Sequence, residues 1–214
     1  MKYVLISLVL FLGQFCQSKD TNKVSKINNT LMEIENGNEV AIFAGGCFWC
    51  TEAVFLELDG VIGIQPGYIG GKNANPTYEE VCSGNSGHAE GVQVVFDPKK
   101  ITYSELLEVF FATHDPTTIN RQGNDVGSQY RSEIFYSNES QLKSAQEYVA
   151  LLNDQNSYGK KVVTKISKAS AFYIAEDYHK NYYNQNKNKS YCEYVIAPKI
   201  DKVRKEFKDK LKTK

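Results

Sequence analysis

The sequence predicts an α+β fold in which helices cover one face of a β-sheet, giving two layers. Short apolar runs typical of strands alternate with segments whose apolar residues recur at helical spacing. Clusters of glycine, proline and asparagine separate these segments, as expected of turns. The chain has 214 residues and is 42% hydrophobic, which suits one domain with a substantial core.

The order of the expected elements specifies the fold further. The pattern predicts strands at 40–44, 61–64, 91–96 and 131–136, with helices at 48–58 and 103–111. This β-α-β-β-α-β order is that of a ferredoxin-like sheet built from split β-α-β units. Later segments add a helix at 138–152, a strand at 161–166, and C-terminal helices near 175–185 and 198–209.

Three stretches are expected to be irregular. Residues 67–71 form a glycine-punctuated loop after the second strand. Residues 76–90 and 113–130 are rich in Gly, Asn, Asp and Ser, and fit neither the helical nor the strand pattern. Because long irregular segments in a compact domain often carry function, we expect these last two to contribute to a site.

The N-terminus resembles an export signal. In residues 1–16, Lys2 is followed by about ten apolar residues, which is typical of a signal peptide and too short for a spanning helix. Cys16 ends this stretch and suggests a lipoprotein, in which cleavage before the cysteine precedes its acylation. Residues 13–15 depart from the usual lipobox, so a plain secretory signal is the alternative. We expect an exported protein, either periplasmic or anchored to the membrane and facing the periplasm.

The rest of the chain divides into three parts. Residues 17–38 form a polar tether, residues 39–207 a globular domain, and residues 208–214 a charged tail. Positive and negative side chains number 25 each, so formal net charge is zero. This balance gives no electrostatic basis for binding nucleic acid. We expect the protein to be a monomer.

The most informative segment is residues 45–52, which read Gly-Gly-Cys-Phe-Trp-Cys-Thr-Glu. It holds the only tryptophan and two of the five cysteines. It lies between an expected strand and an expected helix, where unpaired N–H groups favour an anion such as a thiolate. We therefore expect a lowered pKa for Cys47. Cys47 and Cys50 are three residues apart, close enough for a disulfide across one helical turn.

A Cys-x-x-Cys pair in an exported protein has three interpretations: a redox-active dithiol, half of a metal site, or a structural bridge. A zinc site needs further ligands, and the sequence has no second Cys-x-x-Cys and only three scattered histidines. A bridge across one turn closes a tiny loop and stabilises little. Phe48 and Trp49 fit best as the walls of a small apolar pocket beside a thiolate. The redox interpretation is favoured, with no metal.

Residues 46–49 resemble the signature of the A-type peptide methionine sulfoxide reductases. Further stretches resemble the next blocks of that family in the same order, over 67–71, 75–84, 87–90, 122–132 and 175–179. The resemblance covers about residues 40–179. It implies that residues 39–207 are a catalytic domain that reduces the S epimer of methionine sulfoxide, free or in proteins, and so repairs oxidised proteins.

The resemblance also implies roles for single residues. Cys47 would be the nucleophile that attacks the sulfoxide sulfur. Glu90 would be the acid that polarises the S–O bond and supplies a proton. Tyr78 and Tyr130 would donate hydrogen bonds to the sulfoxide oxygen.

The remaining implied roles concern binding. Phe48 and Trp49 would hold the methyl group of the substrate. Asp125 would organise the pocket, although an acid in Gly-Asn-Asp also fits a simple turn residue. His88 and His179 are expected to make structural hydrogen bonds.

The enzyme must then be reset. Cys47 would be left as a sulfenic acid, and Cys50 is the nearest thiol that can convert it to a disulfide. Cys192 lies where relatives carry C-terminal resolving cysteines and is the alternative. Thioredoxin or an equivalent dithiol would reduce the disulfide, and no bound cofactor is expected. Cys82 is expected to be a small packed residue.

Two other functions compete with this hypothesis. The first is a thioredoxin-like disulfide oxidoreductase that uses Cys47 and Cys50 directly, although the usual Gly-Pro between the cysteines is missing. The second is a non-catalytic module that binds oxidised methionine segments through Phe48 and Trp49.

Overall fold

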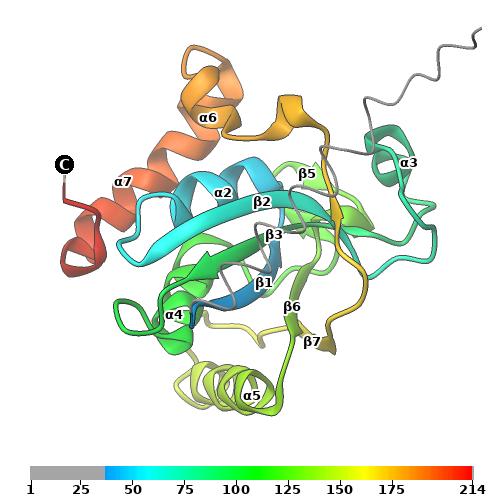
Figure 1. The fold of residues 1–214 in the computed structure, drawn as a ribbon. Coiled ribbons are helices and arrows are strands. Elements are labelled where there is room, and N and C mark those ends of the chain that lie inside the picture. Colours follow the sequence, from blue (N-terminus) through cyan, green and yellow to red (C-terminus); the bar gives the residue numbers. More distant parts are fainter. Residues whose placement is uncertain (1–36, 214) are drawn as a thin grey trace, which may run out of the picture.

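A six-stranded sheet forms the centre of the computed structural model, which describes residues 37–213 (Figure 1). The strands run in the spatial order β7-β6-β1-β3-β2-β8. In chain order they are β1 (Glu39–Gly45), β2 (Val61–Ile69), β3 (Ala89–Phe96), β6 (Ser132–Tyr136), β7 (Lys165–Lys168) and β8 (Tyr173–Ile174). Neighbours are antiparallel except β6 and β7, which are parallel.

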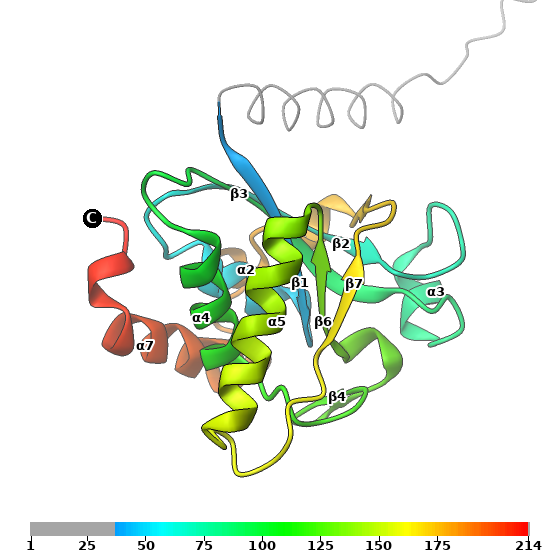
Figure 2. The ribbon, with the colours of Figure 1, turned by 90° about the horizontal axis from the view of Figure 1, so that it is seen from below.

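Helices cover one face of this sheet. They are α2 (Phe48–Phe55), α4 (Tyr103–Thr113), α5 (Glu139–Asp154) and α7 (Ala197–Glu206). Figure 2 shows α4 and α5 side by side next to the sheet, with α7 beyond α4. The α+β class with helices on one face is confirmed, because the large core cluster joins residues of these helices to one face of the strands.

Strand β1 is buried on both faces, which explains its continuous apolar run. Ala41 and Phe43 belong to the large core beneath the helices, whereas Ile42 and Ala44 belong to a smaller cluster on the opposite face. Side chains alternate between faces along a strand, so the two sets separate with a period of two. Residues of the 169–172 segment pack against the smaller cluster.

The second and third strands are longer than predicted. The expected glycine loop at 67–71 is wrong in part, because β2 continues to Ile69. There Gly67 pairs with Gly91 on one side and with Ile174 on the other. A Cβ at position 67 would lie 2.4 Å from the carbonyl oxygen of Tyr173, so the glycine serves the close approach of β8 rather than a turn.

The C-terminal part departs most from prediction. The expected helix near 175–185 is wrong: the segment is largely irregular, with a 3₁₀ turn at Asp177–His179 and a short helix α6 (Tyr182–Gln185). Asn181 takes a left-handed conformation between them and interrupts helical geometry. The last helix begins earlier than expected, because a π-helical turn at Cys192–Ile196 leads directly into α7.

The two long segments that were expected to be irregular contain short ordered elements. Residues 76–90 hold α3 (Tyr78–Cys82), whose N-terminus has a capping box between Thr77 and Glu80. Residues 113–130 hold a hairpin, β4 (Arg121–Gln122) and β5 (Asp125–Val126), followed by a 3₁₀ turn at Ser128–Tyr130.

At the C-terminal end, Leu211 pairs with Leu58, so part of the charged tail packs against the domain.

The predicted signal peptide and nearly all of the predicted tether lie outside the described residues. Within 37–213, no helix combines the length and apolar character that a membrane crossing requires.

Candidate active site

The cysteine pair lies at the turn from β1 into α2, as the sequence predicts. Gly46 makes this turn with φ of 94°, and a side chain there would collide with Gln122 of β4. Cys47 is the N-cap of α2, and its carbonyl accepts the N–H of Cys50 at 3.1 Å. Both cysteines are buried free thiols.

A cavity of about 80 Å³ opens beside Cys47. Every residue to which the family resemblance gave a catalytic or substrate-binding role lines it: Cys47, Phe48, Trp49, Tyr78, Glu90, Asp125 and Tyr130. These residues come from α2, α3, β3, β5 and the turn at 128–130. One more residue, Tyr191, completes the lining. We call this the small cavity.

Glu90 lines the small cavity with a buried carboxyl group that is uncharged at neutral pH. It lies on β3, is 1% exposed, and its Oε2 accepts the backbone N–H of Phe48 at 3.1 Å. Burial is the largest influence and raises the pKa of Glu90 to about 8, against the smaller opposing effect of that hydrogen bond. At neutral pH the carboxyl group therefore carries a proton.

The two tyrosines remain hydrogen-bond donors across the accessible pH range. Burial, followed for Tyr130 by the Glu90 charge, raises the pKa of its hydroxyl group far above the usual value. Burial likewise raises the pKa of Tyr78, followed by its hydrogen bond with Cys82. The backbone N–H of Tyr78 donates to Glu176 Oε1 at 3.0 Å, and Glu176 Oε2 accepts the hydroxyl of Tyr68 at 2.7 Å. Glu176 thus ties α3 to the sheet.

The two thiols influence each other, and their pKa values move in opposite directions. Burial raises the pKa of Cys47 well above its usual range, with Cys50 and Glu90 adding to the effect. The hydrogen bond from Cys47 lowers the pKa of Cys50 to about 7, and the charge of Lys199 contributes. The predicted lowering of the Cys47 pKa is wrong for the substrate-free protein, because the first thiolate of the pair forms on Cys50.

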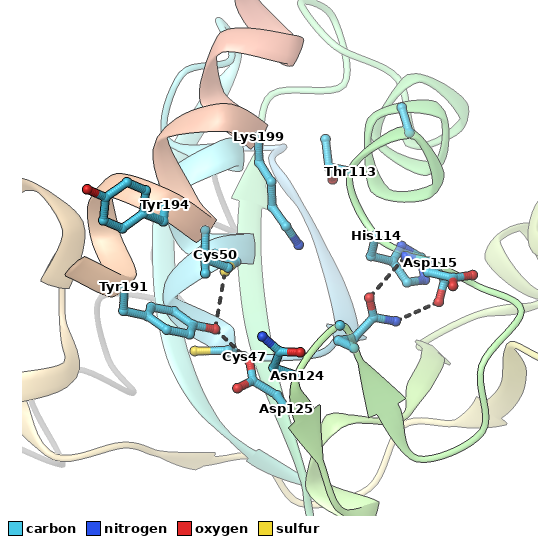
Figure 3. A pocket seen from close by; sticks show the side chains of 14 residues that line it. Cys47, Cys50, Thr113, His114, Asp115, Asn124, Asp125, Tyr191, Tyr194 and Lys199 are labelled. Atoms are coloured by element: carbon cyan, nitrogen blue, oxygen red, sulfur yellow. Dashed lines mark hydrogen bonds between the residues drawn. The ribbon is translucent and has the colours of Figure 1, made fainter. Parts of the chain in front are cut away.

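Tyr191 is a site residue that the sequence did not reveal. Its hydroxyl donates to Asp125 Oδ2 at 2.6 Å and lies 3.7 Å from Cys50 Sγ (Figure 3). Asp125 therefore anchors a side chain that contacts Cys50 as well as lining the small cavity. No motif marks Tyr191, since the tyrosine comes from the C-terminal segment and only the fold brings it to α2.

A larger groove adjoins the small cavity and shares Cys47, Asp125 and Tyr191 with it. It has a volume of about 460 Å³ and is lined by both Cys47 and Cys50, whereas the small cavity is lined by Cys47 alone of the two. Figure 3 shows Cys47, Cys50 and Tyr191 together, with Lys199 extending into the groove and His114 and Asp115 across it. Cys47 therefore lines both openings.

The other predicted residues take structural positions. His88 accepts the N–H of Gly71, and His179 Nδ1 accepts Trp49 Nε1–H at 3.1 Å, which agrees with the structural roles expected of both. Cys192 is fully buried at the start of the π-helical turn and lines neither opening. Cys82 is exposed rather than packed, because α3 buries only Val81. Within the described part of the chain, no cluster of His, Cys, Asp and Glu could hold a metal ion.

Comparisons with known proteins agree on one family. The family model described as peptide methionine sulfoxide reductase matches residues 39–211. A peptide methionine sulfoxide reductase MsrA of Sulfolobus acidocaldarius is 59% identical over 80% of this chain and 97% of its own length. The MsrA of Deinococcus radiodurans is 48% identical over 94% of this chain and 98% of its own.

Solved structures give the same result. Reduced Mxr1 of Saccharomyces cerevisiae is similar with a TM-score of 0.68 and 36% identity, over 72% of this chain and 89% of its own. Methionine sulfoxide reductase A of Corynebacterium diphtheriae is similar with a TM-score of 0.67 and 36% identity, over 71% of this chain and 76% of its own.

Proposed function

This chain belongs to the peptide methionine sulfoxide reductase family and is an oxidoreductase that reduces methionine sulfoxide through its thiols; from this premise we propose which of its residues perform each step. The observation that carries the proposal is the small cavity, whose lining brings together the Cys47 thiol, the neutral carboxyl group of Glu90 and the tyrosines Tyr78 and Tyr130. Such a set supplies both a nucleophile and the proton donors that removal of a sulfoxide oxygen requires.

In the first step, Cys47 Sγ attacks the sulfoxide sulfur. Cys50, whose thiol has the lower pKa of the pair, would take the Cys47 proton as the attack proceeds. Glu90 donates its proton to the sulfoxide oxygen, while the hydroxyls of Tyr78 and Tyr130 stabilise the charge on it. The oxygen transfers to Cys47 as a sulfenic acid, methionine leaves, and the cysteine sulfur is oxidised as the sulfoxide sulfur is reduced.

Selectivity for the S epimer follows from the fixed positions of three groups. The proposed nucleophile Cys47, the proposed oxygen-binding tyrosines and the Phe48 and Trp49 walls all line one small cavity, and each would contact a different substituent of the sulfoxide. A sulfoxide of the opposite hand cannot place its oxygen and methyl group correctly at the same time. The test is a comparison of the two epimers with the purified protein, and equal rates would contradict this selectivity.

In the second step, Cys50 Sγ attacks the Cys47 sulfenic acid, forming the Cys47–Cys50 disulfide and releasing water. Cys50 is one helical turn from Cys47, and its backbone N–H donates to the Cys47 carbonyl at 3.1 Å. Cys192 lines neither opening, which favours Cys50 as the resolving residue over Cys192.

The disulfide is then reduced by thioredoxin or an equivalent dithiol protein. Cys50 lines the larger groove but not the small cavity, so we propose that the dithiol protein approaches the disulfide through the larger groove. Attack on Cys50 Sγ would release Cys47 in its reduced form.

The substrate is methionine sulfoxide in proteins or as the free amino acid, and reduction in proteins amounts to repair. The protein acts as a monomer without a bound cofactor.

Two further proposals concern location and architecture. The charged and apolar pattern of residues 1–16 supports export, and Cys16 supports a lipid anchor facing the periplasm. The antiparallel neighbours β6-β1-β3-β2 support a ferredoxin-like description of the central sheet, to which β7 and β8 are added at the edges.

One experiment tests the assignment of roles. Wild-type protein and the Cys47→Ser variant are each mixed with the S epimer of methionine sulfoxide, without added reductant. We expect about one methionine per wild-type chain and none from the variant. Methionine release by Cys47→Ser would overturn the proposal. A thioredoxin-like oxidoreductase would instead exchange disulfides without consuming sulfoxide.

A further inference from the structure

Trp49 forms one wall of the small cavity and is held by residues from the C-terminal part of the chain. The ring of Tyr182 stacks on it with 3.7 Å between centroids and 6° between planes. Its Nε1–H donates to His179 Nδ1 at 3.1 Å, and burial lowers the pKa of His179, which keeps this acceptor unprotonated. The position of this wall therefore depends on a segment about 130 residues away in sequence.

The position of Tyr182 depends in turn on the conformation of the residue before it. It begins the four-residue helix α6, and the preceding Asn181 has φ of 48° and ψ of 38°. Asparagine adopts this left-handed conformation more readily than most residues with a side chain, and hydrogen bonds to the turn fix its position here. The backbone N–H of Asn181 donates to Glu52 Oε1 at 2.8 Å. The same carboxylate also accepts a hydrogen bond from the backbone of Tyr182.

Glu52 is a buried carboxyl group that the reaction does not use. It is 3% exposed, lies three residues after Trp49 on α2, and lines neither opening of the site. Residues three apart on a helix share a face, so Glu52 and Trp49 both project toward the 179–182 segment. Burial of a carboxyl group is costly unless hydrogen bonds compensate for lost water. Here the compensating donors are the backbone groups that begin α6.

We propose that Glu52 is a positioning residue for substrate binding, which fixes the Asn181 turn so that Tyr182 stacks on Trp49 and holds it against the substrate. The chain of contacts runs from the Glu52 carboxylate to the Asn181 N–H, then through the backbone to the Tyr182 ring, and from that ring to Trp49. The proposal rests on the proposed function in one respect: methionine sulfoxide binds in the small cavity.

The experiment compares Glu52→Ala with Glu52→Gln, which keeps an oxygen acceptor of the same length. We expect Glu52→Ala to raise the KM for methionine sulfoxide about tenfold, with a change of less than about twofold in the saturated single-turnover rate. Glu52→Gln should restore most of the affinity. If Glu52 only supported the fold in general, Glu52→Ala would also lower the single-turnover rate, and Glu52→Gln would not restore it.

Trp49 supplies a second readout, since it is the only tryptophan in the sequence. Loosening of the Tyr182 stack should shift its fluorescence emission to longer wavelength and increase quenching by acrylamide. Tyr182→Leu should reproduce the emission and KM of Glu52→Ala, whereas Tyr182→Phe should retain the stack. Because both changes break one chain of contacts, the double variant should be no worse than either single variant.

The matched control is Glu57→Ala. Glu57 lies just after the end of α2 and pairs with Arg204, which lines neither opening of the site. Glu57→Ala should leave KM and emission unchanged. Unchanged emission or KM in Glu52→Ala would overturn the proposal. If Glu52→Ala does not fold, Tyr182→Leu tests the proposal in its place. A wild-type KM in Tyr182→Leu would then overturn the proposal. Failure of the wild type to bind sulfoxide would instead refute the proposed function, while the emission data would still show whether Glu52 holds Trp49.

Discussion

The backbone N–H of Phe48 donates to Glu90 Oε2 at 3.1 Å and so ties the carboxyl group to the residue directly after Cys47. This one contact sets the acid beside the nucleophile although 42 residues separate its two partners. It also occupies an N–H group at the start of α2 that would otherwise lack a partner. The position of the acid is therefore built into the helix that carries the thiol.

The rate of methionine release should fall at alkaline pH. Burial raises the pKa of Glu90 to about 8, so the proton that the carboxyl group donates is lost as pH rises through that value. The measurement is rapid-quench single turnover from about pH 6 to about pH 10, with substrate saturating. A rate that rises steadily through pH 8 would show that Glu90 does not act as the acid.

Glu90→Gln should slow the same step by about 10²-fold or more, because general acid catalysis commonly contributes that much. The glutamine side chain keeps the size of the carboxyl group and can still accept the Phe48 N–H, so the turn at Cys47 should persist. Retention of wild-type thiol reactivity toward a small alkylating agent is the control. A variant as fast as the wild type would exclude Glu90 from catalysis.

Glu90 should also make stability depend on pH. Its pKa is raised from 4.5 to about 8 on folding, so its contribution to stability is complete below about pH 4.5 and is lost as pH rises through 8. Urea unfolding should therefore show a smaller decrease in the free energy of unfolding across this range for Glu90→Gln than for the wild type. Identical pH profiles would contradict the raised pKa.

Tyr191→Phe should separate the two chemical steps. The variant loses the hydroxyl that bonds Asp125 at 2.6 Å and approaches Cys50 Sγ at 3.7 Å. Without this contact Cys50 is held less firmly, and disulfide formation should slow about 2- to 10-fold, the effect of one hydrogen bond. Methionine release should slow less. Both rates come from one quenched time course, and an equal loss in each would assign Tyr191 to the first step instead.

The sequence predicted the site better than the scaffold around it. The family resemblance, rather than the residue types alone, singled out seven residues from Cys47 to Tyr130, and all seven line one cavity. The segment near 175–185 was predicted as a helix, which the structure contradicts. Its conformation depends instead on buried partners from distant elements, namely Glu52 and Trp49, which no local pattern reveals.

The same limit explains Tyr191 and the pKa of Cys47. Tyr191 reaches Asp125 only because a π-helical turn begins at the next residue and turns the chain into α7. The helix terminus alone suggested a lowered pKa for Cys47. Burial and the neighbouring Glu90 outweigh that effect, and both depend on how the sheet packs against α2.

The central claim is that Cys47 performs the chemistry and Cys50 resets it. The most direct test is mass spectrometry of the protein after one turnover without reductant, with peptides mapped to identify the bridged cysteines. We predict one methionine per chain and a disulfide between Cys47 and Cys50. In Cys50→Ser we predict the same methionine yield with Cys47 as a sulfenic acid that dimedone traps. A bridge from Cys47 to Cys192 in the wild type, or unmodified Cys47 after methionine release, would contradict the account.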